Sequence, residues 1–385
     1  MANNNDNKVL NVPPLRFPEF TKEWEEHALA EYLDFKNGLN PDVKRIGRGL
    51  PFISVMDILA DGTINYDSIR GKVEATEREI ENFSVEKGDI LFQRSSETLE
   101  DVGRANVYMD NRTAVYGGFV IRGRKIGDYN PLFFKYLLST PLARKRTCRM
   151  GAGAQHFNIG QDGLSKISLC FPLMEEQNKI ARLLSLIDER IATQNKIIDK
   201  LQSLIKGLRV CCMQRVYGNN VYLSEIAQIY QPQTISSTEL TEDGFLVYGA
   251  NGIIGKYKDY NHETEQICIT CRGNTCGMVN YTKPMSWITG NAMVINTDKY
   301  QDKVCKRYLY HYLSAYNFNS IISGSGQPQI VRTPLEKLKI TLPTISEQKQ
   351  KAIIFDKIQD KIDINHKVLN LYIGQKQYLL RQMFI

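Results

Sequence analysis

An internal repeat constrains this chain more than any other feature. Leu164–Pro172 reads Leu-Ser-Lys-Ile-Ser-Leu-Cys-Phe-Pro, and Leu335–Pro343 reads Leu-Glu-Lys-Leu-Lys-Ile-Thr-Leu-Pro, an offset of 171 residues (335 minus 164). Each stretch is followed by a Glu-Gln pair, at Glu176–Gln177 and Glu347–Gln348. Self-similarity at a fixed offset indicates one structural unit used twice. We therefore expect two similar units in succession, each ending in the same element.

The element after each proline is predicted to be a long helix. Apolar residues recur in steps of four and three over residues 180–212 and again over residues 355–383. This is the heptad spacing of helices that pair along a seam. The seam residues expected near the two helix middles are Ile187, Ile191, Gln194, Ile198, Ile358, Ile362, Asn365 and Leu369.

Each seam is interrupted by an amide, and the two amides match. Asn365 lies 171 residues after Gln194. A buried amide in a seam costs stability but fixes the register, because a slipped pairing leaves it without a hydrogen-bond partner. We expect the helices to pair antiparallel and to set Gln194 against Asn365. The alternative is two unrelated amphipathic helices, each packed on its own domain.

The length of the first seam predicts a spacer. From Ile180 to Cys212 there are 32 residue steps (212 minus 180), or about 48 Å at 1.5 Å per residue. One turn of DNA measures about 34 Å. Globular units held at the two ends of such a rod would therefore stand more than one DNA turn apart.

The segments between the helices are predicted to fold as α+β domains, because they are rich in Gly, Asn, Tyr and short β-prone runs. We expect a first globular domain over residues 1–172, with an N-terminal arm over 1–20, and a first spacer helix over 173–217. A second domain over 218–343 and a second spacer helix over 344–385 complete the chain. The fold class is thus two similar α+β domains separated by an antiparallel coiled coil.

Two loops at the same place in the repeat combine glycine with residues suited to nucleic acid. Cations neutralise phosphates, while Arg, Gln and Asn offer the paired donors and acceptors that base edges require. A surface loop or surface cation with no ligand is the ordinary alternative for any one of them. The DNA-binding candidates in the first unit are Arg94, Arg104, Arg144, Lys145, Arg146, Arg149, Gln155, His156 and Asn158. Those in the second are Lys256, Tyr257, Arg272, Asn274, Gln327, Gln329 and Arg332.

The composition is compatible with this interpretation. The net charge is +7, which suits a polyanionic partner without requiring one. No apolar run approaches the roughly 18 residues of a membrane helix, and Met1–Lys8 lacks the pattern of a secretory signal. We expect a cytoplasmic protein with no membrane association. Its eight cysteines are then expected to be reduced.

Catalytic patterns are missing from the sequence. Asn11-Val-Pro-Pro14 is not the tetrapeptide of an adenine methyltransferase, and Gly249–Tyr257 departs from a phosphate-binding loop in spacing and in its last residue. The five histidines have no metal-ligand or triad spacing. Cys268, Cys271 and Cys276 open like a zinc site, but no second ligand pair follows, so we expect strand residues and no metal.

Several segments together resemble the specificity subunit of type I restriction-modification systems. They are Val12–Phe20 with Trp24, Val247–Lys256, Gly324–Ile330 and the twice-repeated Pro-x-x-x-Glu-Gln before a long helix. The resemblance spans nearly the whole chain. It departs most in the first unit, where Gln155-His-Phe-Asn158 stands in place of the shorter Gln327-Pro-Gln329.

This resemblance implies a non-catalytic subunit in which two recognition domains each read half of a split target in double-stranded DNA. It also implies two methyltransferase subunits around the spacer and restriction subunits for cleavage. S-adenosylmethionine, ATP and magnesium would belong to those partners, and no cofactor to this chain. The alternatives are a stand-alone DNA adenine methyltransferase and a coiled-coil scaffold that does not bind DNA.

Overall fold

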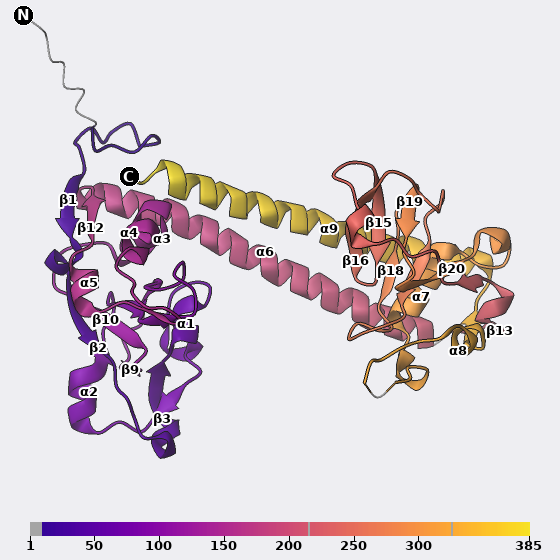
Figure 1. Ribbon diagram of the computed structural model, residues 1–385, viewed down its shortest axis with the longest axis horizontal. Coiled ribbons are helices and arrows are strands. Elements are labelled where there is room, and N and C mark those ends of the chain that lie inside the picture. Colours follow the sequence, from indigo (N-terminus) through magenta and orange to yellow (C-terminus); the bar gives the residue numbers. More distant parts are fainter. Residues whose placement is uncertain (1–9, 215, 325) are drawn as a thin grey trace, which may run out of the picture. The chain divides into compact units, whose positions relative to one another are not determined.

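The computed structural model describes residues 10–214, 216–324 and 326–385, which group into two compact units (Figure 1). The first unit extends to Gln194 and also takes in Val368–Ile385, whereas the second is Asn195–Lys367. Three expectations fall partly outside the described residues. They concern the start of the N-terminal arm, one position of the first spacer segment (215) and one position of the second loop (325).

A four-stranded antiparallel sheet with the order β2-β10-β6-β8 is the centre of the first unit. Beside it lies a sheet with the order β4-β3-β9-β5, in which β3 and β9 run parallel. The strands are β2 (Leu33–Asn37), β3 (Ile46–Ile53), β4 (Lys72–Val73), β5 (Ser84–Val85), β6 (Ile90–Gln93), β8 (Ala105–Val107), β9 (Ala114–Tyr116) and β10 (Val120–Lys125). Short helices α1 (Val55–Leu59) and α2 (Glu77–Phe83) join the second sheet.

Helices α3 (Pro131–Ser139) and α4 (Pro141–Cys148) complete the core of the first unit. Each begins with proline at its first position, after a side-chain cap from Asn130 or Thr140. Helix α3 buries Phe133, Phe134 and Leu137 in a cluster that includes strand residues of β6 and β10. Caps and apolar burial together explain why these helices start and pack where they do.

The second unit repeats this architecture. Its main sheet has the order β14-β20-β17-β18, and a smaller sheet has the order β16-β15-β19 with β15 parallel to β19. The strands are β14 (Gln228–Tyr230), β15 (Phe245–Gly249), β16 (Gly252–Tyr257), β17 (Ile267–Thr270), β18 (Val279–Tyr281), β19 (Ser286–Ile288) and β20 (Ala292–Asn296). Helix α7 (Lys306–Ala315) takes the part of α3. The expected α+β class and the expected duplication are both confirmed. Of the three cysteines expected in strands, Cys268 lies buried in β17, whereas Cys271 follows that strand and Cys276 lies in a turn.

The repeated sequence leads into the long helices in the same way in both units. Strand β12 (Ser168–Phe171) pairs with β1 (Glu25–Ala28), and β21 (Lys339–Leu342) pairs with β13 (Asn219–Tyr222). Further short strands and α-helices are β7 (Ser95–Ser96), β11 (Phe157–Asn158), α5 (Gln161–Ser165) and α8 (Arg332–Glu336). Pro172 or Pro343 then follows the strand, and a long helix begins two residues later.

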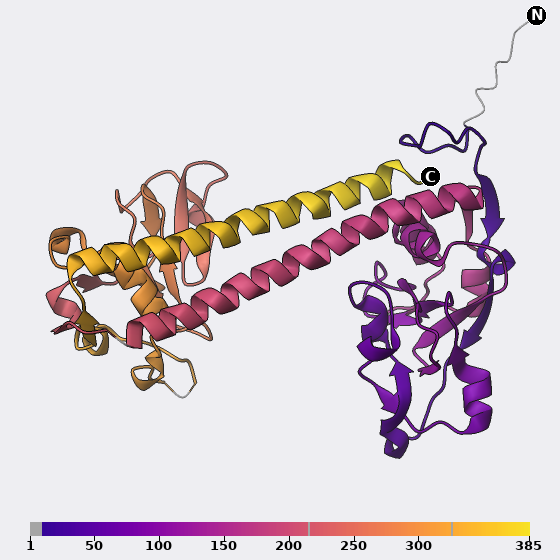
Figure 2. The ribbon, with the colours of Figure 1, turned by 180° about the vertical axis from the view of Figure 1, so that it is seen from behind.

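Helices α6 (Met174–Gln214) and α9 (Ile345–Gln382) are the long elements expected over 173–217 and 344–385. In the first unit, the start of α6 packs with the end of α9, and in the second unit the end of α6 packs with the start of α9 (Figures 1 and 2). The antiparallel direction is therefore confirmed within each unit. In each unit, one hydrophobic cluster contains buried residues from both helices. These residues are Ile180, Leu184, Ile187, Leu379 and Met383 in the first unit, and Ile205, Phe355 and Ile362 in the second.

The other seam residues differ in how deeply they are buried. Ile198 is 4% exposed and Gln194 is 8% exposed, while Ile191, Ile358, Asn365 and Leu369 are half-buried. The Asn365 amide donates to the Lys361 carbonyl at 2.6 Å. Gln194 belongs to the first unit and Asn365 to the second, so their pairing stays a prediction.

The repeated glutamine connects each long helix to its globular unit. Gln177 donates to the Pro172 carbonyl (3.0 Å) and accepts from the backbone N–H of Asn130, the cap residue of α3 (3.0 Å). Gln348 donates to the Pro343 carbonyl (3.0 Å) and accepts from the N–H of Cys305, the cap residue of α7 (2.8 Å). Both side chains are almost fully buried. The repeated Glu-Gln pair is therefore, through its glutamine, a structural joint.

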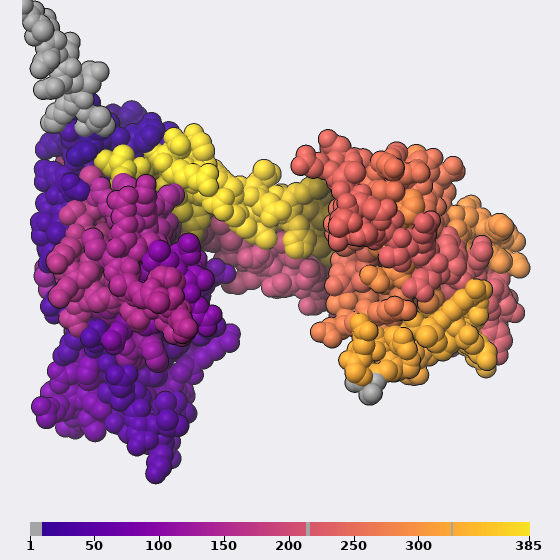
Figure 3. All heavy atoms as spheres, in the orientation of Figure 1, coloured from indigo at the N-terminus to yellow at the C-terminus, as the bar shows by residue number. Residues whose placement is uncertain are grey.

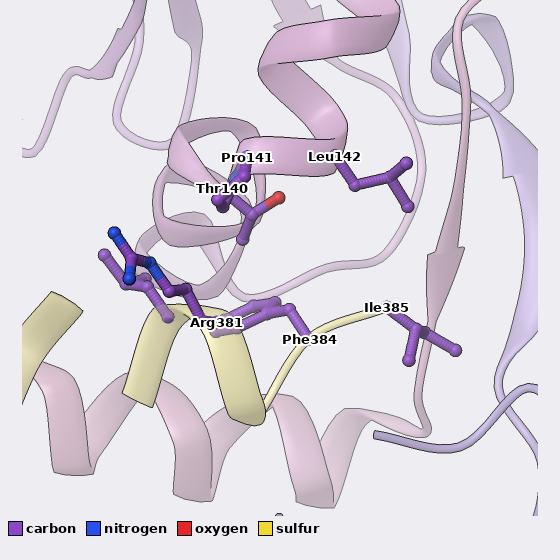
Figure 4. A pocket seen from close by; sticks show the side chains of 7 residues that line it. Thr140, Pro141, Leu142, Arg381, Phe384 and Ile385 are labelled. Atoms are coloured by element: carbon purple, nitrogen blue, oxygen red, sulfur yellow. The ribbon is translucent and has the colours of Figure 1, made fainter. Parts of the chain in front are cut away.

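The end of α9 belongs to the first unit. Figure 3 shows it, in yellow, packed on the indigo and magenta residues of that unit. Phe384 stacks on Phe133 with ring centroids 5.5 Å apart and meets Trp24 edge to face at 6.1 Å. A hollow of about 550 Å³ lies here, between the turn that joins α3 to α4 and the last residues of the chain. Figure 4 shows the side chains that line it. Among the described residues, no helix has both the length and the apolar character needed to cross a bilayer.

Candidate nucleic-acid interface

The glycine-rich loop of the first unit closes on itself and on the end of β6. The backbone groups of Ala152 and Asn158 exchange two hydrogen bonds of 2.9 Å, and Asn158 pairs with Ser95. Gly153 has φ +146°, and a Cβ there would lie 1.9 Å from the His156 carbonyl oxygen. Only glycine fits this bend without displacing backbone. The closed loop exposes the side chains of Gln155, His156 and Asn158.

Arg94 lies at the centre of this arrangement, directly after β6. Its N–H donates to the Phe119 carbonyl (2.9 Å), and its own carbonyl accepts from the Ile159 N–H (3.0 Å). The guanidinium donates to the Gly118 carbonyl at 3.3 Å. Ser95 Oγ donates to the side-chain oxygen of Asn158. The end of β6 thus brings an arginine, a hydroxyl and an amide together on one edge.

The basic run on α4 divides into two kinds of residue. The Arg144 guanidinium donates to the carbonyls of Glu100 (2.9 Å) and Val102 (2.6 Å), and burial lowers its pKa. Arg146 pairs with Glu26 at 2.9 Å and donates to the Ser168 carbonyl. These two arginines hold α4 in place. Lys145 and Arg149 are exposed, as is Arg104 beside Asp101 (2.6 Å), and these three are better placed to meet phosphates.

The second unit builds the same kind of edge. Ser323 and Gln329 exchange backbone hydrogen bonds of 2.9 and 2.8 Å, and Gln329 forms a β-bridge with Arg272. The Gly273 N–H donates to the Pro328 carbonyl at 2.9 Å, which brings Asn274 near this loop. The side chains of Arg272, Asn274, Gln327 and Gln329 are all exposed. The structure therefore gathers four of the seven residues proposed for this unit.

The remaining three make other contacts. Lys256 and Tyr257 end β16, where Lys256 pairs with Asp243 at 3.4 Å and the Tyr257 ring meets Trp287 at 5.1 Å. Arg332 begins α8 and pairs with Glu336 at 2.7 Å. The opposite end of β16 is the part that approaches the loop. There, Thr275 Oγ1 donates to Asn251, two polar residues that composition alone does not single out.

The two arginines that follow the matching strands β6 and β17 are not equivalent. Val120 pairs with Gln93 in the first unit, and Ala292 pairs with Thr270 in the second. Arg94 therefore corresponds to Cys271, and Arg272 corresponds to Ser95. Since successive strand side chains point to opposite faces, one position changes the face on which a side chain lies. Cys271 is buried, whereas Arg272 is exposed beside the loop.

Comparison with known proteins identifies the family. The model described as type I restriction modification DNA specificity domain matches residues 21–203 and 219–371. The chain belongs to this family. The two matched segments of the specificity family follow the two repeats, so each repeat carries one copy of the domain.

A relative within the specificity family extends over almost the whole chain. The type I restriction enzyme MjaVIII specificity subunit of Methanocaldococcus jannaschii is 25% identical over 413 residues, covering 92% of this chain and 89% of its own length. A structure of the S subunit of a type I restriction-modification system from M. genitalium has a TM-score of 0.65 at 17% identity, covering 97% of this chain and 99% of that one.

A further solved structure comes from work on complex assembly and conformational transition of the type I restriction-modification system. It has a TM-score of 0.57 at 14% identity and covers 96% of this chain and 99% of its own. At 17% and 14% identity, these two solved structures show that the chain shares their fold.

Proposed function

We propose that this chain is the non-catalytic specificity subunit of a type I restriction-modification complex and reads a bipartite target in double-stranded DNA. The observation that carries the proposal is the recurrence of a similar edge in both units: a closed glycine-rich loop with exposed amides, beside an arginine that follows a strand of the main sheet by one or two residues. Two equivalent edges in one chain suit a target of two half-sites. The family of the chain supports the same conclusion.

The division of labour at each edge follows from the chemistry of its side chains. Exposed cations such as Lys145 and Arg149 contribute contacts to phosphates, which hold any sequence. The amides of Gln155, Asn158, Gln327 and Gln329 offer a donor and an acceptor together, which base edges distinguish. Sequence selection is therefore assigned to the loops and affinity to the surrounding cations.

The catalytic partners are part of the proposal. Two methyltransferase subunits dock on this chain, and restriction subunits join for cleavage in the cytoplasm. S-adenosylmethionine, ATP and magnesium are bound by those partners. The described residues contain no group of three or more His, Cys, Asp or Glu side chains arranged to hold a metal. A stand-alone methyltransferase is the competing function, and it predicts that the purified chain by itself binds S-adenosylmethionine.

Selection from randomised DNA duplexes by the full chain with its methyltransferase partner tests the reading role. We expect two enriched half-sites at a fixed separation. Gln327→Ala should weaken one half-site by about 1–3 kcal/mol and leave the other unchanged. Gln228→Ala is the matched control, because Gln228 is also exposed but begins β14, at the opposite end of the sheet. No enriched motif with the partner present would contradict the proposal.

The helices are proposed to set the separation of the half-sites. Inserting seven residues after Gln194 in α6 and seven after Asn365 in α9 lengthens each helix by about 10 Å. The preferred gap in the selected duplexes should grow by about three base pairs, at 3.4 Å per base pair. An unchanged gap in a folded insertion variant would show that the helices are not the spacer.

A further inference from the structure

A tight turn between β9 and β10 adjoins the candidate edge of the first unit. The Val120 N–H donates to the Gly117 carbonyl at 2.9 Å and closes the turn. A Cβ on Gly118 would lie 1.8 Å from the side-chain oxygen of Asn40, and one on Gly117 would lie 2.9 Å from the Phe52 ring. The two glycines therefore allow the turn to pack directly on its neighbours. The next residue, Phe119, is held at a fixed place.

Phe119 is unusual in its exposure. It is 68% exposed, while its neighbours from Ala114 to Gly118 and from Val120 to Gly123 are buried. Among the described residues, no other phenylalanine is mostly exposed. The Phe119 ring has no aromatic or cation–π partner among those residues. Burying an exposed phenylalanine ring is favourable, because it removes apolar surface from water. A rigid turn thus presents an apolar group that a ligand would cover.

The position of Phe119 links it to the edge described above. Its carbonyl accepts from the Arg94 N–H, and Arg94 in turn accepts from Ile159, the residue after Asn158. Neighbouring paired segments lie about 4.8 Å apart, so Phe119 is on the order of 10 Å from the loop backbone. The ring therefore stands beside an arginine and amides, on the side of the unit where base contacts are proposed.

The second unit has the same turn with a different residue. The Ala292 N–H donates to the Thr289 carbonyl at 3.0 Å, and the Asn291 carbonyl accepts from Cys271, the counterpart of Arg94. A Cβ on Gly290 would lie 2.4 Å from the Thr234 hydroxyl oxygen, so this glycine is also required by packing. Asn291 consequently corresponds to Phe119. It is exposed, and its side-chain amide has no hydrogen bond within the described residues.

We propose that Phe119 makes an apolar contact with thymine in the half-site read by the first unit, and that Asn291 contacts a base edge from the same position in the second unit. This inference rests on the proposed DNA-reading function. The thymine methyl is the apolar group on a base edge and a known partner of phenylalanine in the major groove, while an asparagine amide matches adenine. The same position of the turn thus contributes to specificity in both units, with phenylalanine in the first and asparagine in the second.

Replacing thymine by deoxyuridine tests the methyl contact, because it removes one methyl group and keeps all base-pair hydrogen bonds. The probes are the duplexes selected by the wild-type complex, with Gln327→Ala marking the half-site of the second unit. For wild type, deoxyuridine at one thymine of the first half-site should weaken binding severalfold. Phe119→Ala should bind the thymine duplex about 5- to 150-fold more weakly than wild type does and should bind both duplexes equally.

Three variants make the result specific. Ile126→Ala is the matched control, since Ile126 is 61% exposed and follows the far end of β10. It should bind like wild type, and neither it nor Phe119→Ala should change the melting temperature, because both side chains are exposed. Asn291→Ala should lose discrimination in the second half-site and retain sensitivity to deoxyuridine in the first.

The outcomes separate this inference from the proposed function. If wild type selects no motif, the proposed function itself fails. If wild type selects two half-sites but the first contains no thymine, or binds deoxyuridine and thymine duplexes equally, the inference is overturned and the function stands. If Phe119→Ala instead prevents copurification of the methyltransferase, the turn is a protein interface, which also overturns the inference.

Discussion

The two units share two hydrogen bonds of the repeated glutamine, to which Gln348 adds a third with the Lys303 carbonyl (3.2 Å), whereas the glutamate before it has a different partner in each unit. Glu176 is 1% exposed and receives two hydrogen bonds of 2.7 Å from Arg16 of the N-terminal arm. Glu347 is exposed and instead accepts from the Thr344 N–H (3.0 Å) and hydroxyl (2.8 Å), which lowers its pKa. A repeated residue thus keeps its role only where its surroundings are repeated too.

A second contrast lies at the sixth residue of α3 and of α7. Tyr136 donates to Asp188 at 2.8 Å in the first unit. In the second unit, His311 is fully buried and its Nε2 lies 2.8 Å from Asp356, while Arg209 donates to Nδ1 at 3.2 Å. Since Nδ1 accepts from arginine, Nε2 carries the proton and the ring is neutral. In each unit, a side chain of the globular core therefore bonds to a long helix, but the two side chains, Tyr136 and His311, respond differently to pH.

The largest expected effect tests the difference between Glu176 and Glu347. Arg16→Ala should lower the free energy of unfolding of the first unit by about 3–5 kcal/mol, because it leaves the Glu176 carboxylate buried without its cation. Thr344→Ala removes only a helix cap from the second unit and should cost about 1 kcal/mol. Urea unfolding, monitored separately in each unit by hydrogen exchange, measures the loss of stability in both variants. Equal losses would show that Glu176 is not stabilised by the arm.

Substituting the shared glutamine should affect both units alike. Gln177→Ala and Gln348→Ala each leave buried backbone groups without hydrogen bonds and should cost about 2 kcal/mol. Protection of α3 should fall in the first variant and that of α7 in the second, as measured by hydrogen exchange with mass spectrometry. Gln228→Ala, at an exposed position, should change neither helix. A loss confined to one unit would contradict the equivalence of the two joints.

The smallest expected effect is a pH dependence confined to the second unit. Burial, together with the neighbouring Arg209, lowers the pKa of His311 below its ordinary value near 6.5. Its contribution to stability is present above that value and is lost as the pH falls, because the unfolded chain then binds the proton more readily. The loss begins as the pH falls through about 6.5, where the imidazole of the unfolded chain takes up its proton.

Hydrogen exchange at pH 7.0 and 5.5, corrected for intrinsic rates, measures that loss. Protection of α7 should fall with pH more than protection of α3, because the hydroxyl of Tyr136 does not titrate in this range. His311→Gln should remove the difference between the two helices. An equal pH response of α3 and α7 in the wild type would show that His311 is not responsible.

The sequence revealed those features of the fold that leave a periodic or repeated signal. The offset between the two copies, the heptad seams and the loops before Asn158 and Gln329 all follow from spacing that neighbouring residues share. Local patterns also explain the strand that precedes each proline. The two units and the antiparallel direction of the helices within each were predictable for these reasons.

What the sequence did not reveal depends on contacts between distant residues. Arg144 and Arg146 belong to a basic run, but carbonyl groups far along the chain engage their guanidinium groups. The one-residue shift between Arg94 and Arg272 is visible only in strand pairing. Phe119 leaves no periodic signal, since a single apolar residue is expected to be buried until the fold exposes it.

The central claim is that two equivalent edges in one chain read the two halves of one target. Mapping methylated adenines across the source genome, with this gene present, deleted and restored, tests it most directly. We predict that deletion removes methylation from one split motif, and that restoring the gene with Gln327→Ala relaxes one half of that motif only. Methylation that persists after deletion, or that is lost from an uninterrupted motif, would contradict the account.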